Sequence, residues 1–182
     1  FPTLRCLEQI RNDVLYHDVN VNVVAIGGGF SYGALGMSHH ATEDLAIMRA
    51  LPGLAVVSPG CLWETRGATR ALALTDGPGY LRRDKSNAGD TSREGEVFKL
   101  GAIRTLREGD ALTIAATGGI LAEALSAAEE LDGEGIACRV LSVNSLRPLD
   151  KDTVERACEE TGGLLVVEEH LVEGGLGGLL AE

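Results

Sequence analysis

Two adjacent histidines carry the clearest chemical signal in this sequence. Val21–Ile26 is an apolar run rich in β-branched residues, typical of a parallel strand, and the glycine-rich stretch Gly27–Gly36 follows it. His39 and His40 come next, so we expect them at the carboxyl end of a strand, where open α/β sheets bind ligands. Imidazole can polarise a carbonyl or hold a substrate hydroxyl near neutral pH. The alternative is that one histidine caps the following helix and the other is exposed.

A second group of residues suited to ligand binding is the basic cluster Arg82, Arg83 and Lys85. It lies at the end of a short predicted strand, in a chain whose formal net charge is −11. A guanidinium presents a planar fork to phosphate, and a lysine presents a point charge. We therefore interpret the cluster as a candidate phosphate site, with a solvated basic face as the alternative.

Other kinds of site have weaker support. The acidic balance argues against nucleic acid as a ligand, because phosphate backbones need clustered Lys and Arg. The glycines Gly27–Gly29 lack the register of a dinucleotide-binding loop, and no spacing suggests a third metal ligand beside the histidines. Glu168, Glu169 and His170 follow a predicted strand, where a run of charges is usually a solvated loop. No apolar run approaches the roughly 20 residues that a membrane span needs.

The order of strand and helix patterns predicts the fold class. Apolar runs alternate with segments of helical periodicity, which is typical of parallel sheets joined by right-handed crossovers. We therefore expect an α/β fold with mainly parallel sheets flanked by helices. The predicted helices are Leu4–Tyr16, Thr42–Ala50, Leu62–Leu74, Ile120–Leu131 and Asp150–Glu160, and the predicted strands are Val21–Ile26, Leu54–Ser58, Gly79–Arg82, Ala111–Ala116, Ala137–Val143 and Leu164–Val167.

One polar segment separates two series of strands and helices. Residues 86–96, SNAGDTSREGE, lose all periodicity and contain two glycines, as linkers commonly do. We therefore predict two domains, residues 1–88 and residues 97–182, joined by a linker at residues 86–96.

Several longer stretches resemble one enzyme family. They are RCLEQIRNDV at residues 5–14, SHHATEDLAIMRALP at residues 38–52, ATGGI at residues 116–120 and VEEH…GGLGG at residues 167–178. The whole chain resembles the transketolase family, and most of all the C-terminal subunit of its split form, in which the catalytic halves are separate subunits. The resemblance implies part of a pyrimidine-binding domain followed by most of a C-terminal domain. We expect the sequence to be a fragment of a longer protein.

The resemblance also implies roles for individual residues. His39 matches the family histidine that contacts the bound sugar, so we expect a catalytic role for it. Ser38 and His40 belong to the same loop and are expected to bind substrate. Lys85 stands where the family has a basic residue for the sugar phosphate, and Arg82 is a second candidate. No metal ligand is expected in this chain.

The cofactor implied by the resemblance is thiamine diphosphate with Mg²⁺. Phe1 lies in the region expected to contact the pyrimidine ring of the cofactor. The family glutamate that activates this ring, and the pattern that binds diphosphate and Mg²⁺, have no counterpart in this sequence. We therefore expect a diphosphate-binding partner subunit or domain, a homodimer or heterotetramer, and a cytoplasmic location.

Two departures from the family pattern leave the donor and acceptor sugars open. Leu35 stands where full-length transketolases have an acid, and Gly27 stands where they have a histidine. The implied function is transfer of a two-carbon ketol unit between sugars or sugar phosphates. The alternatives are a 1-deoxyxylulose-5-phosphate synthase, a 2-oxo acid dehydrogenase beta subunit, or, from another class, a non-catalytic assembly or regulatory pair of domains.

Overall fold

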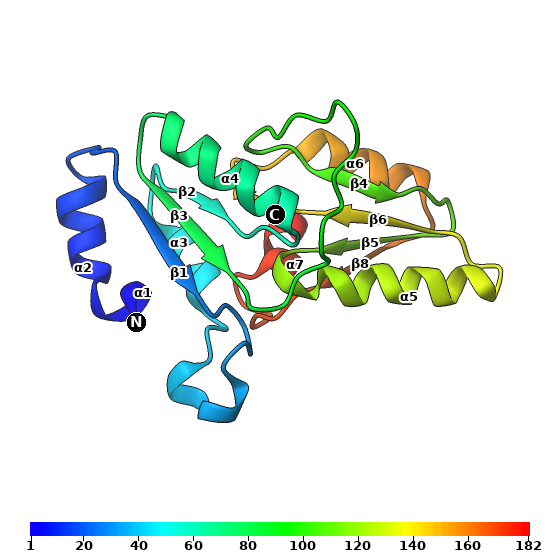
Figure 1. Ribbon diagram of the computed structural model, residues 1–182, viewed down its shortest axis with the longest axis horizontal. Coiled ribbons are helices and arrows are strands. Elements are labelled where there is room, and N and C mark those ends of the chain that lie inside the picture. Colours follow the sequence, from blue (N-terminus) through cyan, green and yellow to red (C-terminus); the bar gives the residue numbers. More distant parts are fainter.

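The computed structural model describes all residues from Phe1 to Glu182 and contains two four-stranded sheets that lie side by side (Figure 1). The first sheet has the strand order β1 (Asn22–Ile26), β3 (Gly79–Arg83), β2 (Ala55–Val57), β7 (Ser145–Arg147). The second has the order β4 (Arg104–Arg107), β6 (Cys138–Ser142), β5 (Leu112–Ala116), β8 (Leu164–Val167). The pairs β2–β7 and β4–β6 are antiparallel, and every other pair is parallel.

Helices cover both faces of the first sheet. Side chains alternate between the two faces of a strand, so neighbours such as Val56 and Val57 enter different cores. On one face, Val56 packs with α3 (Asp44–Ala50) and the N-terminal helices, and on the other face Val57 packs with α4 (Leu62–Leu74). The buried members of the two cores are Ile10, Leu45, Met48, Leu51, Leu54, Val56, Tyr80 and Leu146 on the α3 side, and Val57, Ala68, Leu72 and Leu81 on the α4 side.

The second sheet is enclosed in the same way. Ile114 and Val140 pack against α5 (Leu121–Gly133) on one face. Ala115 and Leu141 pack on the other face with α6 (Lys151–Glu160) and α7 (Leu176–Ala181), and α7 lies between the two sheets (Figure 1). The cores consist almost entirely of aliphatic side chains, in keeping with an aromatic content of only 4%.

The α/β fold class predicted from the sequence is confirmed, with differences at short elements. The predicted helix over residues 4–16 is divided into α1 (Pro2–Arg5), α2 (Leu7–Gln9) and a π-helical segment η1 (Ile10–Leu15). Strands β4 and β7 and helix α7 were not predicted, because each has only three to six residues and periodicity needs a longer window. No helix has both the length and the apolar character needed to cross a membrane.

Strand β7 links the two halves of the chain. It follows β6 of the second sheet in sequence, but it pairs with β2 at the edge of the first sheet. There, Arg147 Nη1 donates a hydrogen bond of 2.6 Å to the carbonyl of Leu51. The division into residues 1–88 and 97–182 therefore stays a prediction, because the C-terminal half completes the N-terminal sheet.

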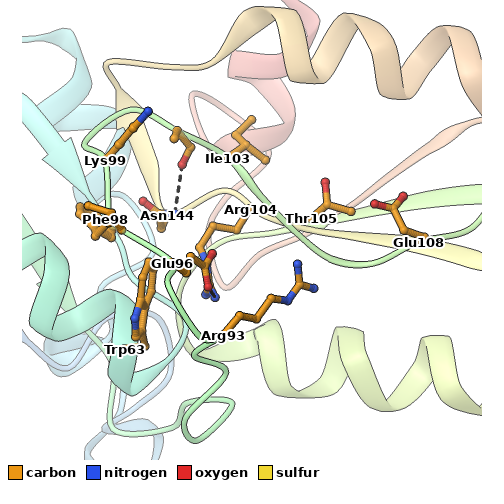
Figure 2. Close-up of a pocket in the computed structure, with 12 residues that line it drawn as sticks. Trp63, Arg93, Glu96, Phe98, Lys99, Ile103, Arg104, Thr105, Glu108 and Asn144 are labelled. Atoms are coloured by element: carbon orange, nitrogen blue, oxygen red, sulfur yellow. Dashed lines mark hydrogen bonds and ion pairs between the residues drawn. The ribbon is translucent and has the colours of Figure 1, made fainter.

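A small cavity of about 270 Å³ lies where α4 meets the start of the second sheet (Figure 2). Trp63 of α4 and Phe98 form part of its wall, with ring centroids 5.8 Å apart. Asn144 closes another side and donates from Nδ2 to the carbonyl of Ala102 at 3.2 Å. The segment around Phe98 is therefore packed onto α4 rather than extended into solvent.

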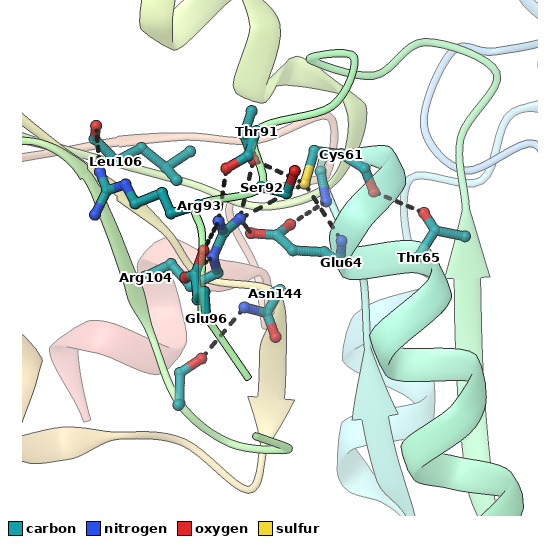
Figure 3. A network of polar contacts seen from close by, with 12 residues as sticks. Cys61, Glu64, Thr65, Thr91, Ser92, Arg93, Glu96, Arg104, Leu106 and Asn144 are labelled. Carbon is teal, nitrogen blue, oxygen red and sulfur yellow. Dashed lines mark hydrogen bonds and ion pairs between the residues drawn. The ribbon is translucent and has the colours of Figure 1, made fainter. Parts of the chain in front are cut away.

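A buried arginine fastens the predicted linker to both halves of the chain (Figure 3). Arg104 donates to Glu64 of α4 at 2.9 Å and to Glu96 at 2.7 Å, and its Nη2 also donates to the carbonyl of Thr91. Burial alone would lower the pKa of this guanidinium, but the hydrogen bonds to Glu96 and Glu64 raise it overall, so Arg104 stays charged. Residues 86–96 are thus held by hydrogen bonds at several points.

Candidate functional site

The paired histidines lie on a loop between β1 and α3 that projects from the body of the chain (Figure 1). At its base, Gly29 and Ala41 exchange two backbone hydrogen bonds of 2.9 Å each. Between them, the 3-10 turns η2 (Gly33–Leu35) and η3 (Met37–His39) are joined by Gly36, whose φ of +77° is rarely adopted by residues with a Cβ. These backbone hydrogen bonds close the base of the loop, so the loop holds His39 and His40 in defined positions.

A cavity of about 820 Å³ lies between this loop, β1 and the N-terminal helices. The volume is in the range of small-molecule sites, and its wall combines apolar and aromatic side chains with a few polar groups. The structure brings four of the predicted site residues into this wall, namely Phe1, Ser38, His39 and His40. We call it the histidine pocket.

His39 has the surroundings of a group that can contact a substrate. Its Nδ1 lies 3.0 Å from the hydroxyl oxygen of Ser38, and the ring of Phe1 meets its ring edge-on at 5.7 Å between centroids. Its Nε2 makes no hydrogen bond within the chain. The ring is therefore oriented from one side and can donate to or accept from a ligand oxygen on the other.

His40 contacts its own loop more closely. Its Nε2 lies 3.3 Å from the carbonyl oxygen of Gly33, and its ring packs against Phe30 with centroids 5.0 Å apart. These contacts hold the loop together across η2. A substrate contact by His40 stays a prediction.

Lys85 lies beside the histidine pocket, against the ring of Tyr32. The Lys85 Nζ lies 3.7 Å from the centroid of the Tyr32 ring, which forms part of the pocket wall. The backbone N–H of Lys85 donates to the hydroxyl oxygen of Ser31 at 3.3 Å. Lys85 is exposed and makes no ion pair, so its charge is available to a ligand anion.

Arg82 has a different environment from that expected of a phosphate ligand. Its side chain is only 1% exposed, with Nε 3.2 Å from Asp44 and Nη1 3.8 Å from Asp84. Its Nη2 donates to the carbonyls of Ala41 and Glu169. The structure therefore does not support the expected phosphate contact, because carboxylates and carbonyls of its own chain surround this guanidinium.

The residues around Arg82 form a buried polar cluster that sequence reasoning missed. Tyr80 donates its hydroxyl to Asp44 at 2.7 Å. Burial, and secondly the Asp44 carboxylate, raise the pKa of Tyr80 above its ordinary value, so the phenol stays protonated. Tyr80, Arg82 and Asp84 alternate along and just beyond β3, which places them on one face of the strand. This spacing of two was the available signal for the cluster.

Comparison with known proteins identifies the family. The family model described as the transketolase pyrimidine binding domain matches residues 1–90, and the model described as the transketolase C-terminal domain matches residues 101–182. The chain belongs to the transketolase family.

Individual transketolase subunits are among the proteins that this chain is similar to. The chain is 37% identical to a subunit of the apulose-4-phosphate transketolase of Phocaeicola vulgatus and 38% identical to the 6-deoxy-6-sulfo-D-fructose transketolase subunit SqwH of Clostridium sp.. All of the chain aligns, covering 59% and 56% of these relatives. A solved structure described as a split gene transketolase, inactive beta4 tetramer, aligns over all of the chain and 58% of its own, with a TM-score of 0.88 and 38% identity.

Transketolases depend on thiamine diphosphate, and the wall of the histidine pocket fits only one part of that cofactor. Phe1, Ile26 and Leu35 offer apolar contacts to a flat aromatic ring. The two carboxylates in the wall are engaged within the chain, Glu43 by Thr42 and Asp44 by the buried cluster. The pocket therefore suits a pyrimidine ring and lacks a free pair of acids for a Mg²⁺-bound diphosphate.

Residues Glu168–His170 do not form the solvated loop that we expected. In this transketolase-family chain, Glu168 binds the start of α7 and His170 binds the backbone of α3. The Glu168 carboxylate accepts from two backbone N–H groups at the start of α7, at 2.6 and 2.9 Å. His170 donates from Nδ1 to the carbonyl of the next residue and accepts at Nε2 from the N–H of Ala46. The roles of Glu168 and His170 are therefore structural.

Glu169 is expected to make the stability of the chain depend on pH. Burial, and secondly the Asp84 carboxylate, raise the pKa of Glu169 above its ordinary value. The folded protein then binds this proton more tightly than the unfolded chain does, so stability falls as the pH rises from the ordinary glutamate pKa to the raised one. The E169Q variant should lack this loss, and its melting temperature relative to that of wild type should rise across that interval. The exposed residue Glu173 provides the control E173Q, and a wild-type profile parallel to that of E169Q would contradict the prediction.

Proposed function

We propose that this chain is part of a thiamine-diphosphate-dependent transketolase that transfers a two-carbon ketol unit between sugars or sugar phosphates. The observation that carries the proposal is the histidine pocket, in which His39 and an apolar wall face one cavity in a chain of this family. The bound cofactor supplies carbanion stabilisation. The names of the relatives favour ketol transfer over the synthase, the dehydrogenase subunit and the non-catalytic pair of domains.

The residues of the pocket take separate roles in this proposal. His39, held at Nδ1 by Ser38, orients a substrate oxygen or exchanges a proton with it through Nε2. Phe1 contributes to the face that receives the pyrimidine ring. Lys85 holds an anionic group at the far end of the sugar, where binding energy can be used at the reacting carbon. The two relatives are named for sugars with a phosphate or a sulfo group, which supports an anion site.

The proposal includes a diphosphate-binding partner subunit or domain. Large apolar side chains around the histidine pocket are more than half exposed, and an exposed apolar patch of this kind is typical of an interaction surface. The residues are Phe1, Leu4, Val24, Ile26, Phe30, Leu35 and Met37. The pocket would then lie between chains, with this chain on the pyrimidine side, in an assembly such as a homodimer or heterotetramer.

The test is reconstitution of ketol transfer. The protein alone should show no turnover and no micromolar binding of thiamine diphosphate with Mg²⁺ by calorimetry, because it lacks acids for the metal and diphosphate. Adding the diphosphate-binding partner should restore both. Tight cofactor binding by the isolated protein, or no ketol transfer by the reconstituted assembly over a panel of sugars and sugar phosphates, would contradict the proposal.

A further inference from the structure

We propose that Tyr32 is a positioning residue whose ring contacts His39 in the wall of the histidine pocket and holds Lys85 beside that wall, and so sets the preference for a sugar with an anionic end. This inference rests on the proposed function of the pocket. Tyr32 lies in the projecting loop and is half-buried, with its ring in the pocket wall.

The first contact of the ring is with a cation. The Lys85 Nζ lies 3.7 Å from the ring centroid, well within the distance at which an ammonium is attracted by the face of an aromatic ring. The backbone of Lys85 is held by the Ser31 hydroxyl, which in turn donates to the carbonyl of Gly28 at 2.7 Å. The backbone N–H and the ammonium group of Lys85 are therefore held by the consecutive loop residues Ser31 and Tyr32, which reduces the entropy lost when an anion binds.

The second contact fixes the ring itself. An added Cβ on Gly27 would lie 2.2 Å from Cε2 of Tyr32, so the ring lies directly on the glycine backbone at the end of β1. Gly27 also has a φ of +103°, which disfavours any other residue there. The ring thus occupies the space that a side chain at position 27 would take.

The third contact is with the imidazole. The rings of Tyr32 and His39 have centroids 6.4 Å apart and are tilted by 52°, within the range of favourable aromatic pairs. One ring therefore touches the strand end, the cation and the imidazole. Because the same ring contacts Lys85 and His39, it fixes the position of each relative to the other, and a substrate that spans both must match that arrangement.

The contact of Tyr32 with Lys85 can be tested without any turnover. In the reconstituted complex, the ring current of Tyr32 should shift the NMR signals of the Lys85 side chain upfield, with Lys85→Met used for assignment. Tyr32→Phe should keep the shift, since neither contact uses the hydroxyl, and Tyr32→Leu should abolish it. Inorganic phosphate should perturb the Lys85 signals at lower concentration in wild type than in Tyr32→Leu. Equal shifts in wild type and Tyr32→Leu would overturn the inference.

The effect on selectivity is measured with two acceptors that differ only in phosphate, ribose 5-phosphate and ribose. Tyr32→Leu should raise the KM for the phosphorylated acceptor about fivefold, the size of one cation–π contact, and change the KM for ribose by less than about twofold. An equal loss of kcat with both acceptors in Tyr32→Leu would show that the ring also positions His39. Tyr32→Phe should restore both parameters. The control Tyr16→Leu removes an exposed tyrosine that packs on His17 away from the pocket and should change neither parameter.

Equal changes in KM for both acceptors, or a Phe variant as impaired as the Leu variant, would overturn the inference. If the wild-type complex transfers no ketol unit to either acceptor, the proposed function fails. The ring-current shift and the phosphate titration still decide in that case whether Tyr32 positions Lys85.

Discussion

Replacing His39 by alanine is expected to reduce the kcat of ketol transfer by about 100-fold or more, the usual contribution of a positioned proton donor or acceptor. The physical reason is that His39 offers a free Nε2 to the histidine pocket while Ser38 orients the ring through Nδ1. Alanine removes both the hydrogen bond to the substrate and the proton that it could exchange. The measurement is steady-state kinetics of the reconstituted complex with the native sugar.

Two controls separate catalysis from folding in this experiment. His17→Ala removes an exposed histidine far from the pocket and should leave kcat unchanged. The melting temperature of the H39A variant should stay close to that of wild type, because the side chain lies on a projecting loop and contributes to no apolar core. A kcat within about twofold of wild type in a folded variant would remove His39 from the proposed mechanism.

The Arg82→Met variant is expected to lose about 3–5 kcal/mol of folding free energy, the range for breaking a buried ion pair by removing one partner. It would leave Asp44 and Asp84 without a counter-charge, and the carbonyls of Ala41 and Glu169 without their donor. At this chain length the loss corresponds to a fall of roughly 6–20 °C in melting temperature. Thermal unfolding followed by circular dichroism measures it.

The neighbouring residue gives a matched control for Arg82. Arg83 makes no ion pair, so Arg83→Met should change the melting temperature by no more than a few degrees. Adding Asp84→Asn to Arg82→Met should recover part of the lost stability, because an asparagine oxygen can still accept from the N–H of Gly119 without a buried charge. Similar melting temperatures for the two methionine variants would show that the cluster contributes little.

The sequence was sufficient to predict the alternating fold and the loop with its histidines. Long amphipathic segments such as Leu62–Leu74 have the bounds that their periodicity indicated. The histidine loop was recognisable because glycines follow a strand of β-branched residues, a local pattern that needs no knowledge of distant contacts. The separate environments of Arg82 and Lys85 were not predictable in this way, since they depend on which face of β3 meets α3 and on carbonyls more than 40 positions away in the chain.

The parts that escaped prediction depend on contacts between distant segments. The backbone groups of β7 find their partners in β2, which is about 90 residues earlier, and its own sequence carries no periodic signal. Glu168 and His170 look like solvated charges until the positions of α7 and α3 are known. Tyr32 lies in a loop that also contains the aromatic residue Phe30, and only the structure shows that its ring contacts Gly27, Lys85 and His39.

The pairing of β7 with β2 bears on how the chain becomes a folded unit. A polypeptide that ended within residues 86–96 would expose the edge of β2, with unpaired N–H and C=O groups that invite association with other chains. During synthesis the N-terminal sheet stays open at that edge until Arg147 has left the ribosome. Self-association and domain swapping are therefore hazards of truncation at this point, and we expect the two halves of the chain to unfold together.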